Sequence, residues 1–464
     1  MVDGPRRRRR YAIVGTGARA EMFARALAVD HADRCELVAL ADPNPVRLRV
    51  HNDTLRRLGA PPAVEYAAAD FGEMLDKEAV DVVVVTTVDR VHDEYIVAAL
   101  DAGRDAVTEK PMTIDAPRCR RILDAVERTG RRVTVTFNYR YNPVHEAVRR
   151  VLADGEIGEV GSVHFEWLLD VRHGADYFRR WHRDKANSGG LLVHKATHHF
   201  DLVNWWLRSV PESVYAQGRL FFYGEAGRRH GYDRGYARAH GAPEAAGDPF
   251  ALDLAANDGL RRLYLEAEDH DGYQRDRGVF APGISIEDDL AVVVRYSTGP
   301  TMSYHLTAYA PWEGYRVMVN GSRGRLELEV VESDHVAPAA AGGVKGGGPE
   351  GLGGGEIKRA SLHGAEAAAE TGWVRLRVCP FWQPPRDIEV PGYTREGHGG
   401  ADARMTAVLF GGADDPLGRA ATERDGALSL LTGLAANESL ATGAPVLVAD
   451  LLDMAVQPDA RGVT

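Results

Sequence analysis

Hydrophobic positions in the first 137 residues follow two alternating patterns. Short, nearly continuous apolar runs predict strands buried on both faces, and stretches with apolar residues at helical spacing predict the helices between them. The predicted strands cover residues 11–14, 36–41, 81–87, 106–108 and 132–137, and the predicted helices cover 18–29, 92–102 and 115–128. This alternation indicates an α/β domain over residues 1–137, with a doubly wound parallel sheet.

The pattern changes after residue 137. The stretches 160–171, 213–223, 286–297, 301–308 and 316–331 have the composition of strands, and helices are predicted over 190–207 and 424–442. We therefore predict a second, α+β domain over residues 138–464, built on a large, open, mostly antiparallel sheet. Insertions are expected near 224–280 and 335–400. The second insertion contains nine glycines in residues 337–355, which is typical of a surface loop.

The overall charge restricts the partners of the chain. Its 464 residues include 56 Lys and Arg against 67 Asp and Glu, a net charge of −11. This balance argues against broad nucleic-acid binding and against an anionic membrane surface. The basic run 6–10 leads directly into the first strand, so we expect a solvated tail. No apolar run approaches the about 18–20 residues that span a bilayer.

The three cysteines, Cys35, Cys119 and Cys379, lie far apart in the sequence. Such spacing predicts neither a disulfide framework nor a cysteine-based zinc site. We therefore expect a protein of the reducing cytoplasm.

The first predicted strand ends in a glycine turn that is typical of dinucleotide-binding domains. Residues 15–20 read G-x-G-x-x-A, and Asp42 ends the second strand 22 residues after Ala20. The first glycine permits the tight turn, and the second lets the backbone approach a pyrophosphate at the helix N-terminus. The predicted cofactor-binding residues in this region are Gly15, Thr16, Gly17, Ala18, Arg19 and Asp42.

The position of Asp42 favours NAD over NADP. Its carboxylate would accept hydrogen bonds from both ribose hydroxyls and repel a 2′-phosphate. Arg19 and Arg47 could instead hold that phosphate, so NADP stays an alternative.

Lysine is rare in this chain, with six lysines among the 56 basic residues. Lys110 follows a predicted parallel strand, at the sheet edge where ligands of open α/β sheets bind. Its ammonium could hold a substrate oxygen. A lysine in a candidate site is informative because desolvation can remove its proton, whereas an arginine keeps its charge. The alternative is an ordinary loop lysine.

The stretch "GGLLVHKATHHFDLVNWW", residues 189–206, holds further candidate chemistry. If 190–207 form one helix, His194, His198 and Asp201 share a face, with Lys195 and His199 on another. Two imidazoles on one face suit proton transfer, and Asp201 could orient one of them. The H-x-x-x-H spacing also occurs in zinc helices, but Lys195 replaces the general-base glutamate, so we expect no metal. A purely structural role is the remaining alternative, above all for His199.

The phrase E-K-P at 109–111, behind the glycine turn, resembles the Gfo/Idh/MocA family of nicotinamide-dependent oxidoreductases. Further similar stretches are TTVDRVH at 86–92, NYRYNP at 138–143, the histidine stretch itself, GYRVMVNGSRGRL at 314–326 and LTGLAANESLATGAPV at 431–446. They cover the chain nearly end to end. Val88, His194 and Ala196 stand where the family usually has proline, aspartate and glycine, and EGHGGAD at 396–402 is additional.

The resemblance implies an N-terminal Rossmann domain and a second domain whose open sheet mediates self-association, so we expect a homo-oligomer, a dimer or a tetramer. It supports Lys110 and His198 as the catalytic pair. His194 departs from the family pattern, and we expect it to assist His198 or to bind a substrate hydroxyl. The resemblance also adds Thr87, His92, Glu109 and Lys110 to the predicted cofactor-binding residues.

Polar aromatic residues around the histidine stretch suggest a carbohydrate-like ligand. Aromatic faces stack on sugar C–H surfaces, while arginine and histidine bind hydroxyls or carboxylates. The predicted substrate-binding residues are Asn138, Arg140, Tyr141, Trp181, His182, His194 and Asp201, with Tyr139, Tyr177, Arg180 and Lys185 nearby. His398 and Asp402, in a predicted glycine-rich loop, could close the pocket.

Three functions follow as hypotheses. The first is an NAD-dependent dehydrogenase that takes hydride from a secondary hydroxyl of a sugar, sugar acid, cyclitol or glycoside. The second is an enzyme that retains its NAD and oxidises transiently to cleave or epimerise a glycoside. The third is a non-catalytic NAD-binding sensor, against which the presence of both Lys110 and His198 argues.

Overall fold

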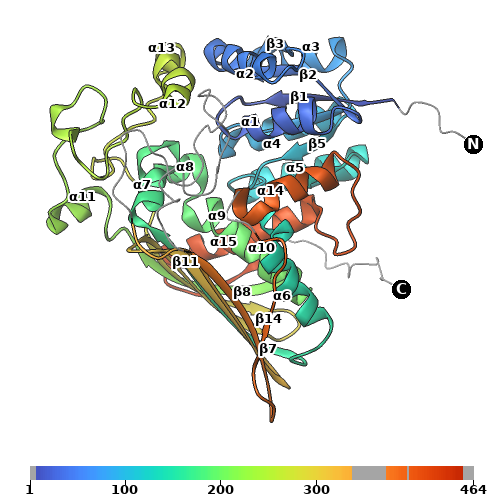
Figure 1. Cartoon of the computed structure of the whole chain (residues 1–464), viewed down its shortest axis with the longest axis vertical. Helices are drawn as coiled ribbons and strands as arrows, with labels where there is room; N and C mark the ends of the chain where they lie inside the picture. Colours follow the sequence, from blue (N-terminus) through green and yellow to red (C-terminus); the bar gives the residue numbers. More distant parts are fainter. Residues whose placement is uncertain (1–6, 337–371, 394–396, 453–464) are drawn as a thin grey trace, which may run out of the picture.

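The N-terminal domain is built on a seven-stranded sheet. The computed structural model describes residues 7–336, 372–393 and 397–452 (Figure 1). Six strands are parallel, and the seventh, which comes from near the C-terminus, runs antiparallel to its neighbour. The order across the sheet is β15 (Ala421–Thr422), β6 (Val133–Val135), β5 (Asp105–Thr108), β4 (Val82–Val85), β1 (Arg9–Val14), β2 (Cys35–Asp42) and β3 (Val64–Ala67).

The predicted Rossmann fold is confirmed, and all of its predicted strands and helices are present. All four valines of β4 are buried, as expected for a central strand with helices on both faces. The helices of this domain are α1 (Ala20–Arg25), continued by a π-helical turn to Asp30, α2 (Pro45–Arg57), α3 (Phe71–Lys77), α4 (His92–Asp101) and α5 (Ala116–Thr129).

Helix α2 was not predicted from the sequence. Its apolar residues Val46, Leu48 and Val50 alternate with polar residues, a pattern of period two that does not indicate a helix. The helix begins at Pro45, and the side chain of Asn44 caps it by accepting from the backbone N–H of Val46.

The second domain is built on a nine-stranded sheet. Neighbouring strands are antiparallel except β7 and β10, which are parallel. The order is β14 (Arg386–Ile388), β13 (Trp373–Pro380), β12 (Gly324–Ser333), β11 (Glu313–Gly321), β7 (Val160–Asp170), β10 (Thr301–Ala310), β9 (Asp289–Tyr296), β8 (Pro211–Arg219) and β16 (Val446–Leu447). The predicted open, mostly antiparallel sheet is therefore confirmed. Strands β13 and β14 lie where only an insertion was expected, and residues 337–355 lie outside the described residues.

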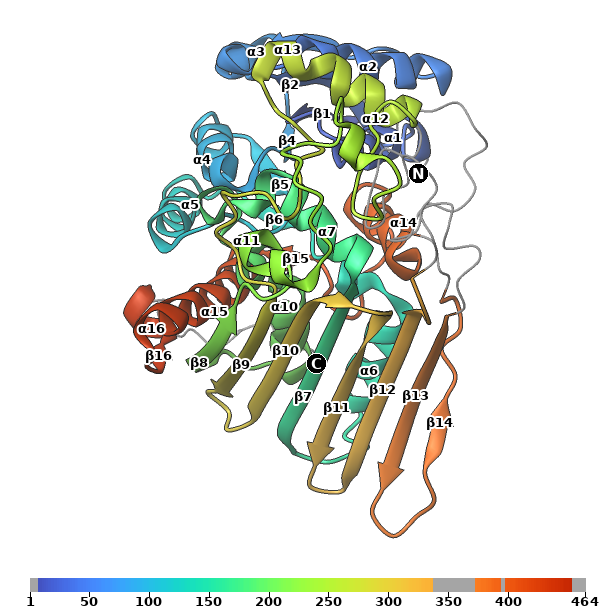
Figure 2. The ribbon, with the colours of Figure 1, turned by 90° about the vertical axis from the view of Figure 1, so that its left-hand side faces the viewer.

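Helices cover one face of this sheet. They include α6 (Pro143–Ala153), α10 (Thr197–Leu207) and the long α15 (Glu423–Thr442), which packs on β8 and on α10. Over most of its length, the opposite face carries no helix in Figure 2. Along β9 the side chains alternate between buried and exposed, as expected when only one face of a sheet is covered by the core.

The insertion at 224–280 contains several short helices that reach the N-terminal domain. Its first helix is α11 (Gly224–Gly227); α12 (Asp258–Leu263) and α13 (Glu268–Asp271) follow, and both lie beside α2 in Figures 1 and 2. Leu254, Leu260 and Leu263 form a small apolar cluster with Val50 of α2. The insertion therefore connects the second domain to helix α2 of the Rossmann domain.

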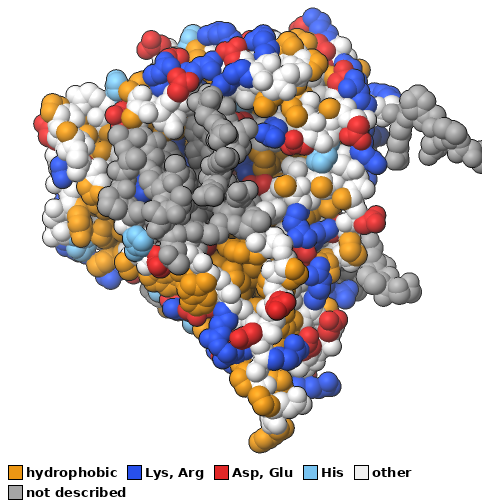
Figure 3. Space-filling view, in the orientation of Figure 1, with side chains coloured by type: hydrophobic (Ala, Val, Ile, Leu, Met, Phe, Trp, Pro, Cys, Tyr) orange, Lys and Arg blue, Asp and Glu red, His pale blue; other side chains and the backbone are white. Residues whose placement is uncertain are grey.

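Charged side chains of both signs are interspersed over the described parts of the face shown in Figure 3. No helix in the described ranges is both long and apolar enough to cross a membrane.

Candidate active site

The glycine turn after β1 has the geometry that a dinucleotide requires. Gly15 has a φ of +87°, and a Cβ on it would lie 2.6 Å from the backbone N of Thr87, so only glycine fits. By contrast, no atom lies within 4 Å of the position that a Cβ on Gly17 would take. That open space fits the close approach of a pyrophosphate to the backbone.

Asp42 is fixed at the end of β2 by two backbone groups. Its Oδ2 accepts from the N–H of Thr16 at 2.6 Å, and its Oδ1 accepts from the N–H of Asn44 at 2.8 Å. A carboxylate has about four acceptor positions, so acceptor capacity remains for ribose hydroxyls.

The insertion contacts the glycine turn and the helix that follows β2. The N–H of Ala18 donates to the hydroxyl of Tyr264 at 3.3 Å, and Nη1 of Arg47 lies 2.6 Å from Oδ2 of Asp271. Tyr264 and Asp271, which lie 246 and 224 residues further along the chain, therefore contact the glycine turn and α2.

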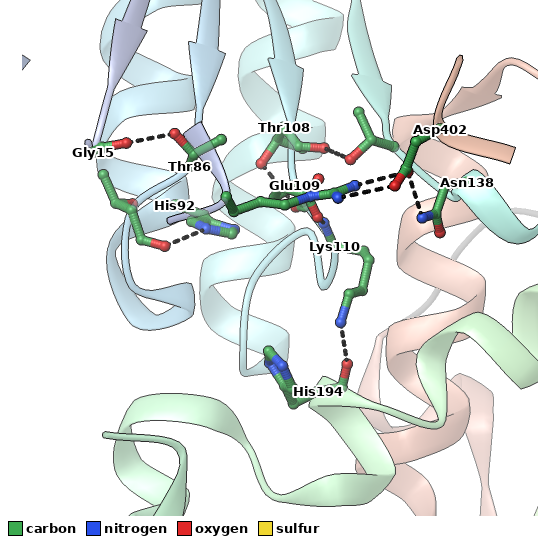
Figure 4. A network of polar contacts seen from close by, with 12 residues as sticks. Gly15, Thr86, His92, Thr108, Glu109, Lys110, Asn138, His194 and Asp402 are labelled. Carbon is green, nitrogen blue, oxygen red and sulfur yellow. Dashed lines mark hydrogen bonds and ion pairs between the residues drawn. The ribbon is translucent and has the colours of Figure 1, made fainter. Parts of the chain in front are cut away.

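Glu109, Asn138 and Asp402 belong to one polar network beside the turn (Figure 4), which also includes Arg19. Nε of Arg19 donates to Oε1 of Glu109 at 2.7 Å, and its Nη2 donates to Asp402 at 3.3 Å. Asn138 also donates to Asp402, at 2.8 Å. The guanidinium that was predicted to meet the cofactor is thus held by two carboxylates, one of them from the second domain.

His92 and Thr87 connect the two segments that follow β4 and β5. Nδ1 of His92 lies 2.9 Å from the carbonyl oxygen of Pro111, and Nε2 lies 3.1 Å from that of Thr87. Burial lowers the pKa of this histidine, although both carbonyl contacts oppose the shift. The ring therefore positions the loop that carries Lys110.

Lys110 spans the junction between the two domains. Its Nζ donates to the carbonyl oxygen of His194 at 2.9 Å (Figure 4). Burial lowers the pKa of Lys110 to about 8, although the nearby carboxylates of Asp89 and Glu109 oppose the shift. A group with such a pKa changes its charge close to neutral pH.

His194 does not lie on the same helix as His198, so the prediction of one helix over 190–207 was wrong. Helix α9 (Leu191–His194) ends at His194, and α10 begins at Thr197. The N–H groups of Lys195 and Ala196 both donate to the carbonyl of Leu191, which closes the first helix and separates the two. The two histidines therefore do not share one face of a single helix.

Asp89 is the partner of His194. Nδ1 of the imidazole lies 2.5 Å from Oδ2 of Asp89, which belongs to the short 3₁₀ turn Asp89–Val91 after β4. Burial raises the pKa of Asp89 well above its usual range and lowers that of His194 well below, so the pair favours one shared proton over separated charges. Sequence reasoning missed Asp89, although it lies inside the stretch TTVDRVH that was singled out.

His198 lies in an aromatic environment. Its ring stacks on Tyr139 with centroids 4.4 Å apart, and the residue is only 5% exposed. Beside it, Nζ of Lys195 donates to the Tyr139 hydroxyl at 3.1 Å and lies 4.8 Å from the ring centre of Trp167. His199 is fully buried, with Nδ1 2.7 Å from the hydroxyl of Tyr304, which fits a structural role.

Asp201 does not orient an imidazole, contrary to the predicted role. Both its oxygens accept from Arg140, at 2.6 and 2.7 Å, and Arg140 also lies 3.1 Å from Asp425 of α15. Tyr141 is buried next to this pair. Arg140 and Asp201 thus form a buried ion pair at the domain junction.

Several predicted substrate-binding residues do meet His194. The ring of His182 lies 4.1 Å from that of His194, and Trp181 stacks on His182 at 3.6 Å. Tyr177 also contacts His194, edge to face at 5.8 Å. Two charged residues nearby form ion pairs with other side chains, Arg180 with Asp176 and Lys185 with Glu287.

The predicted glycine-rich loop at 396–402 is helical from Gly397 onward, so that prediction was wrong. Helix α14 (Gly397–Leu409) begins there and brings Asp402 to Arg19. The side chain of His398 lies outside the described residues. Among the side chains described, no three of the His, Cys, Asp or Glu type come together as a group that could hold a metal ion.

Two family models match this chain. The model described as "Oxidoreductase family, NAD-binding Rossmann fold" matches residues 9–137, and "Oxidoreductase family, C-terminal alpha/beta domain" matches residues 149–345. The protein belongs to the Gfo/Idh/MocA family. It is thus an oxidoreductase with an NAD-binding Rossmann domain, and the resemblance described above is confirmed.

Other members of the Gfo/Idh/MocA family are similar over different lengths. YteT of Bacillus subtilis (strain 168), which is named as an oxidoreductase, is 33% identical over 458 residues, covering 95% of this chain and 98% of YteT. Inositol 2-dehydrogenase of Rhizobium meliloti (strain 1021) is 31% identical over 228 residues, covering 48% of this chain and 62% of the enzyme.

Solved structures of low sequence identity share the fold. The WlbA dehydrogenase from Bordetella pertussis, in complex with NADH and UDP-GlcNAcA, has a TM-score of 0.59 at 19% identity and covers 95% of this chain and 99% of its own. The aldose–aldose oxidoreductase from Caulobacter crescentus has a TM-score of 0.58 at 17% identity and covers 95% and 100%.

Proposed function

We propose that this oxidoreductase takes hydride from a secondary hydroxyl of a sugar, sugar acid, cyclitol or glycoside, with NAD as the acceptor. One observation carries the proposal. Lys110 and the Asp89–His194 pair converge at the domain junction, beside the carboxyl ends of the strands that form the dinucleotide site. Ligands of open α/β sheets bind at that edge.

NAD, when bound, accepts the hydride at its nicotinamide ring. The residues of the chain then have to manage the hydroxyl proton and the charge on the substrate oxygen. The Lys110 ammonium is suited to donate a hydrogen bond to that oxygen. His194, whose Nδ1 faces the Asp89 carboxylate, has Nε2 left to accept the proton. In this proposal Asp89 is a positioning residue, and His198 stays a second candidate for the acid/base role.

NAD is proposed in preference to NADP because of Asp42. Its carboxylate is held by backbone N–H groups at the end of β2, the position where an acidic residue binds the ribose hydroxyls in NAD-dependent enzymes. A 2′-phosphate placed there would meet a negative charge in a buried setting.

The substrate class rests on the side chains around His194 and on the names of relatives. His182, Trp181 and Tyr177 supply aromatic surface and a polar ring beside His194. Relatives include enzymes named inositol 2-dehydrogenase and D-apiose dehydrogenase. We propose a polyhydroxylated ring or chain of that kind for this chain too.

Three variants test the catalytic assignment. A panel of cyclitols, aldoses, sugar acids and glycosides is screened with NAD⁺ for NADH absorbance, and the best substrate is used for Lys110→Met, His194→Ala and His198→Ala. We expect Lys110→Met and His194→Ala each to lower kcat/KM by about 10²–10⁴-fold, as is usual for acid–base groups. A wild-type rate in both would refute the assignment, and a loss confined to His198→Ala would transfer the role to His198.

The hypothesis of a retained NAD is favoured by the insertion. Tyr264 and Asp271 contact the glycine turn and α2, so residues of the second domain lie beside the proposed cofactor site. Mass spectrometry of nucleotide released by denaturing dialysed protein separates the hypotheses. Stoichiometric NAD, together with turnover that needs none added, favours transient oxidation, whereas empty protein favours an ordinary dehydrogenase.

A further inference from the structure

Arg47 lies beside the carboxylate that marks the ribose site. Its Nη1 is 3.8 Å from Oδ1 of Asp42, at the start of the helix that follows β2. In dinucleotide-binding domains, an arginine in this region accommodates the 2′-phosphate of NADP. The choice between the two cofactors therefore depends on whether this guanidinium is available.

The insertion engages Arg47 from several sides. Its Nη1 lies 2.6 Å from Oδ2 of Asp271, and its Nε donates to the carbonyl of Leu263 at 3.3 Å. The guanidinium carbon lies 6.0 and 5.9 Å from the ring centres of Tyr264 and Tyr273. The side chain of Arg47 is only 11% exposed, so these contacts also keep it from turning toward solvent.

Asp271 is itself held in place. Nδ2 of Asn44 donates to its Oδ2 at 3.0 Å, and the same amide donates to the carbonyl of Ala267 at 2.9 Å. Partial burial opposes ionisation of Asp271, but the Asn44 hydrogen bond and the Arg47 charge lower its pKa below the usual value. Its carboxylate is therefore charged at neutral pH.

The local charge follows from these three ionisable groups. Asp42, Arg47 and Asp271 together carry one net negative charge, and without Asp271 the sum would be zero. A phosphate is repelled by the first arrangement, whereas a neutral ribose hydroxyl is not. Asp271 thus acts twice, since it adds a negative charge and also pairs with Nη1 of Arg47, while the buried Nη2 has no hydrogen-bond partner among the described residues.

We propose that Asp271, a residue of the insertion and not of the Rossmann domain, determines the cofactor specificity of this enzyme by withholding Arg47 from a 2′-phosphate. The proposal rests on the proposed function, in which NAD is the preferred cofactor. It assigns to the 224–280 insertion a part in the adenosine end of the cofactor site.

Calorimetric titration of the full chain with NAD⁺ and with NADP⁺ tests this without any substrate. In Asp271→Asn, the ratio of the Kd for NADP⁺ to the Kd for NAD⁺ should fall by about tenfold, the size of one charge-assisted hydrogen bond. Asp269→Asn is the matched control, because Asp269 is exposed on the same short helix and forms no ion pair with any residue described. In Asp269→Asn, the ratio of the two Kd values should stay at the wild-type value.

Two further variants keep the result interpretable. Asp271→Ser removes the same charge with a shorter side chain and should give the same shift, so a folding defect of one variant does not decide the outcome. Adding Arg47→Met to Asp271→Asn should abolish the gain in NADP⁺ affinity, since the freed guanidinium is then absent.

An unchanged ratio in both Asp271 variants overturns the inference while the proposed function stands. Equal weakening of both nucleotides also overturns it, because Asp271 would then only anchor the insertion. Wild-type protein that prefers NADP⁺, or binds neither nucleotide, overturns the proposed cofactor and this inference together.

Discussion

Asp89 and His194 come from different domains and meet through one short contact, 2.5 Å long. Each residue alone is unremarkable in the sequence, since an aspartate after a strand and a histidine near a helix end are common. Together they form the arrangement in which a carboxylate fixes the tautomer of an imidazole and leaves the other nitrogen for a substrate.

Asp89→Asn should lower kcat without weakening cofactor binding. The amide keeps the volume but no longer holds Nδ1–H as a carboxylate does, so we expect a fall in kcat of about 10²-fold. Steady-state kinetics and NAD⁺ titration measure the two effects. Asp101→Asn, on the exposed end of α4, is the control and should leave both unchanged. Normal kcat in Asp89→Asn would show that the pair is only structural.

The pKa of Lys110 predicts the alkaline side of the pH profile. With its pKa lowered to about 8 by burial, Lys110 is an ammonium below that pH and a neutral amine above it. If the ammonium holds the substrate oxygen, kcat/KM should fall as the pH rises through about 8. In Lys110→Arg the charge persists, so the residual activity should lack this decline. An identical decline in both proteins would assign it to another group.

At the scale of elements, the break between α9 and α10 determines where His194 lies. Helix α9 ends at His194 because two successive N–H groups share the carbonyl of Leu191, and α10 begins three residues later, at Thr197. Helix α15 packs against α9. A Cβ on Gly433 of α15 would lie 2.4 Å from the carbonyl oxygen of Leu192. The close approach of these two helices therefore requires glycine.

Gly433→Ala should displace α9 and with it His194. We expect a loss of about 1–3 kcal/mol in the free energy of unfolding, as for other overpacked sites, together with a lower kcat/KM and a nearly normal Kd for NAD⁺. Gly72→Ala on α3 is the matched control, because nothing lies within 4 Å of its added Cβ. That control should be neutral or slightly stabilising. Thermal unfolding of both variants measures the change in stability, and steady-state kinetics measures the change in kcat/KM.

The two domains share structure at the scale of the whole molecule. Strand β15, from near the C-terminus, pairs with β6 of the Rossmann sheet, and the buried Arg140–Asp201 pair with Asp425 ties α10 and α15 to the end of the same sheet. Ion pairs, glycine contacts and an added strand thus hold the junction where Lys110 meets His194.

The exposed face of the nine-stranded sheet should mediate self-association. Val293 of β9 is 50% exposed and lies opposite Tyr215 of β8, which is 37% exposed. Light scattering should give the mass of a dimer or a tetramer, and Val293→Glu should lower it. Val64→Glu, at a valine 47% exposed on the edge of the other sheet, is the control and should not. A monomeric wild type would refute the predicted homo-oligomer.

The elements whose hydrophobic residues repeat with a regular period could be predicted from the sequence. The buried strands of the Rossmann sheet and the alternating strands β7 to β12 follow from local pattern, because side-chain burial repeats every two residues or runs unbroken there. Helix α2 could not be predicted in this way. Its alternating apolar and basic residues are typical of a strand, and the helix is supported by its Asn44 cap and by Leu260 and Leu263 of the insertion.

By itself, the sequence determined the fold class, the glycine turn with Asp42, and the family, because these depend on residues close together along the chain. Only the tertiary structure decided which side chains act together. Asp89 joins His194, Asp201 turns to Arg140, and Asp271 occupies Arg47, across separations of 105, 61 and 224 residues. No local period encodes such contacts, since burial and charge pairing at a domain junction arise only when both domains are packed together.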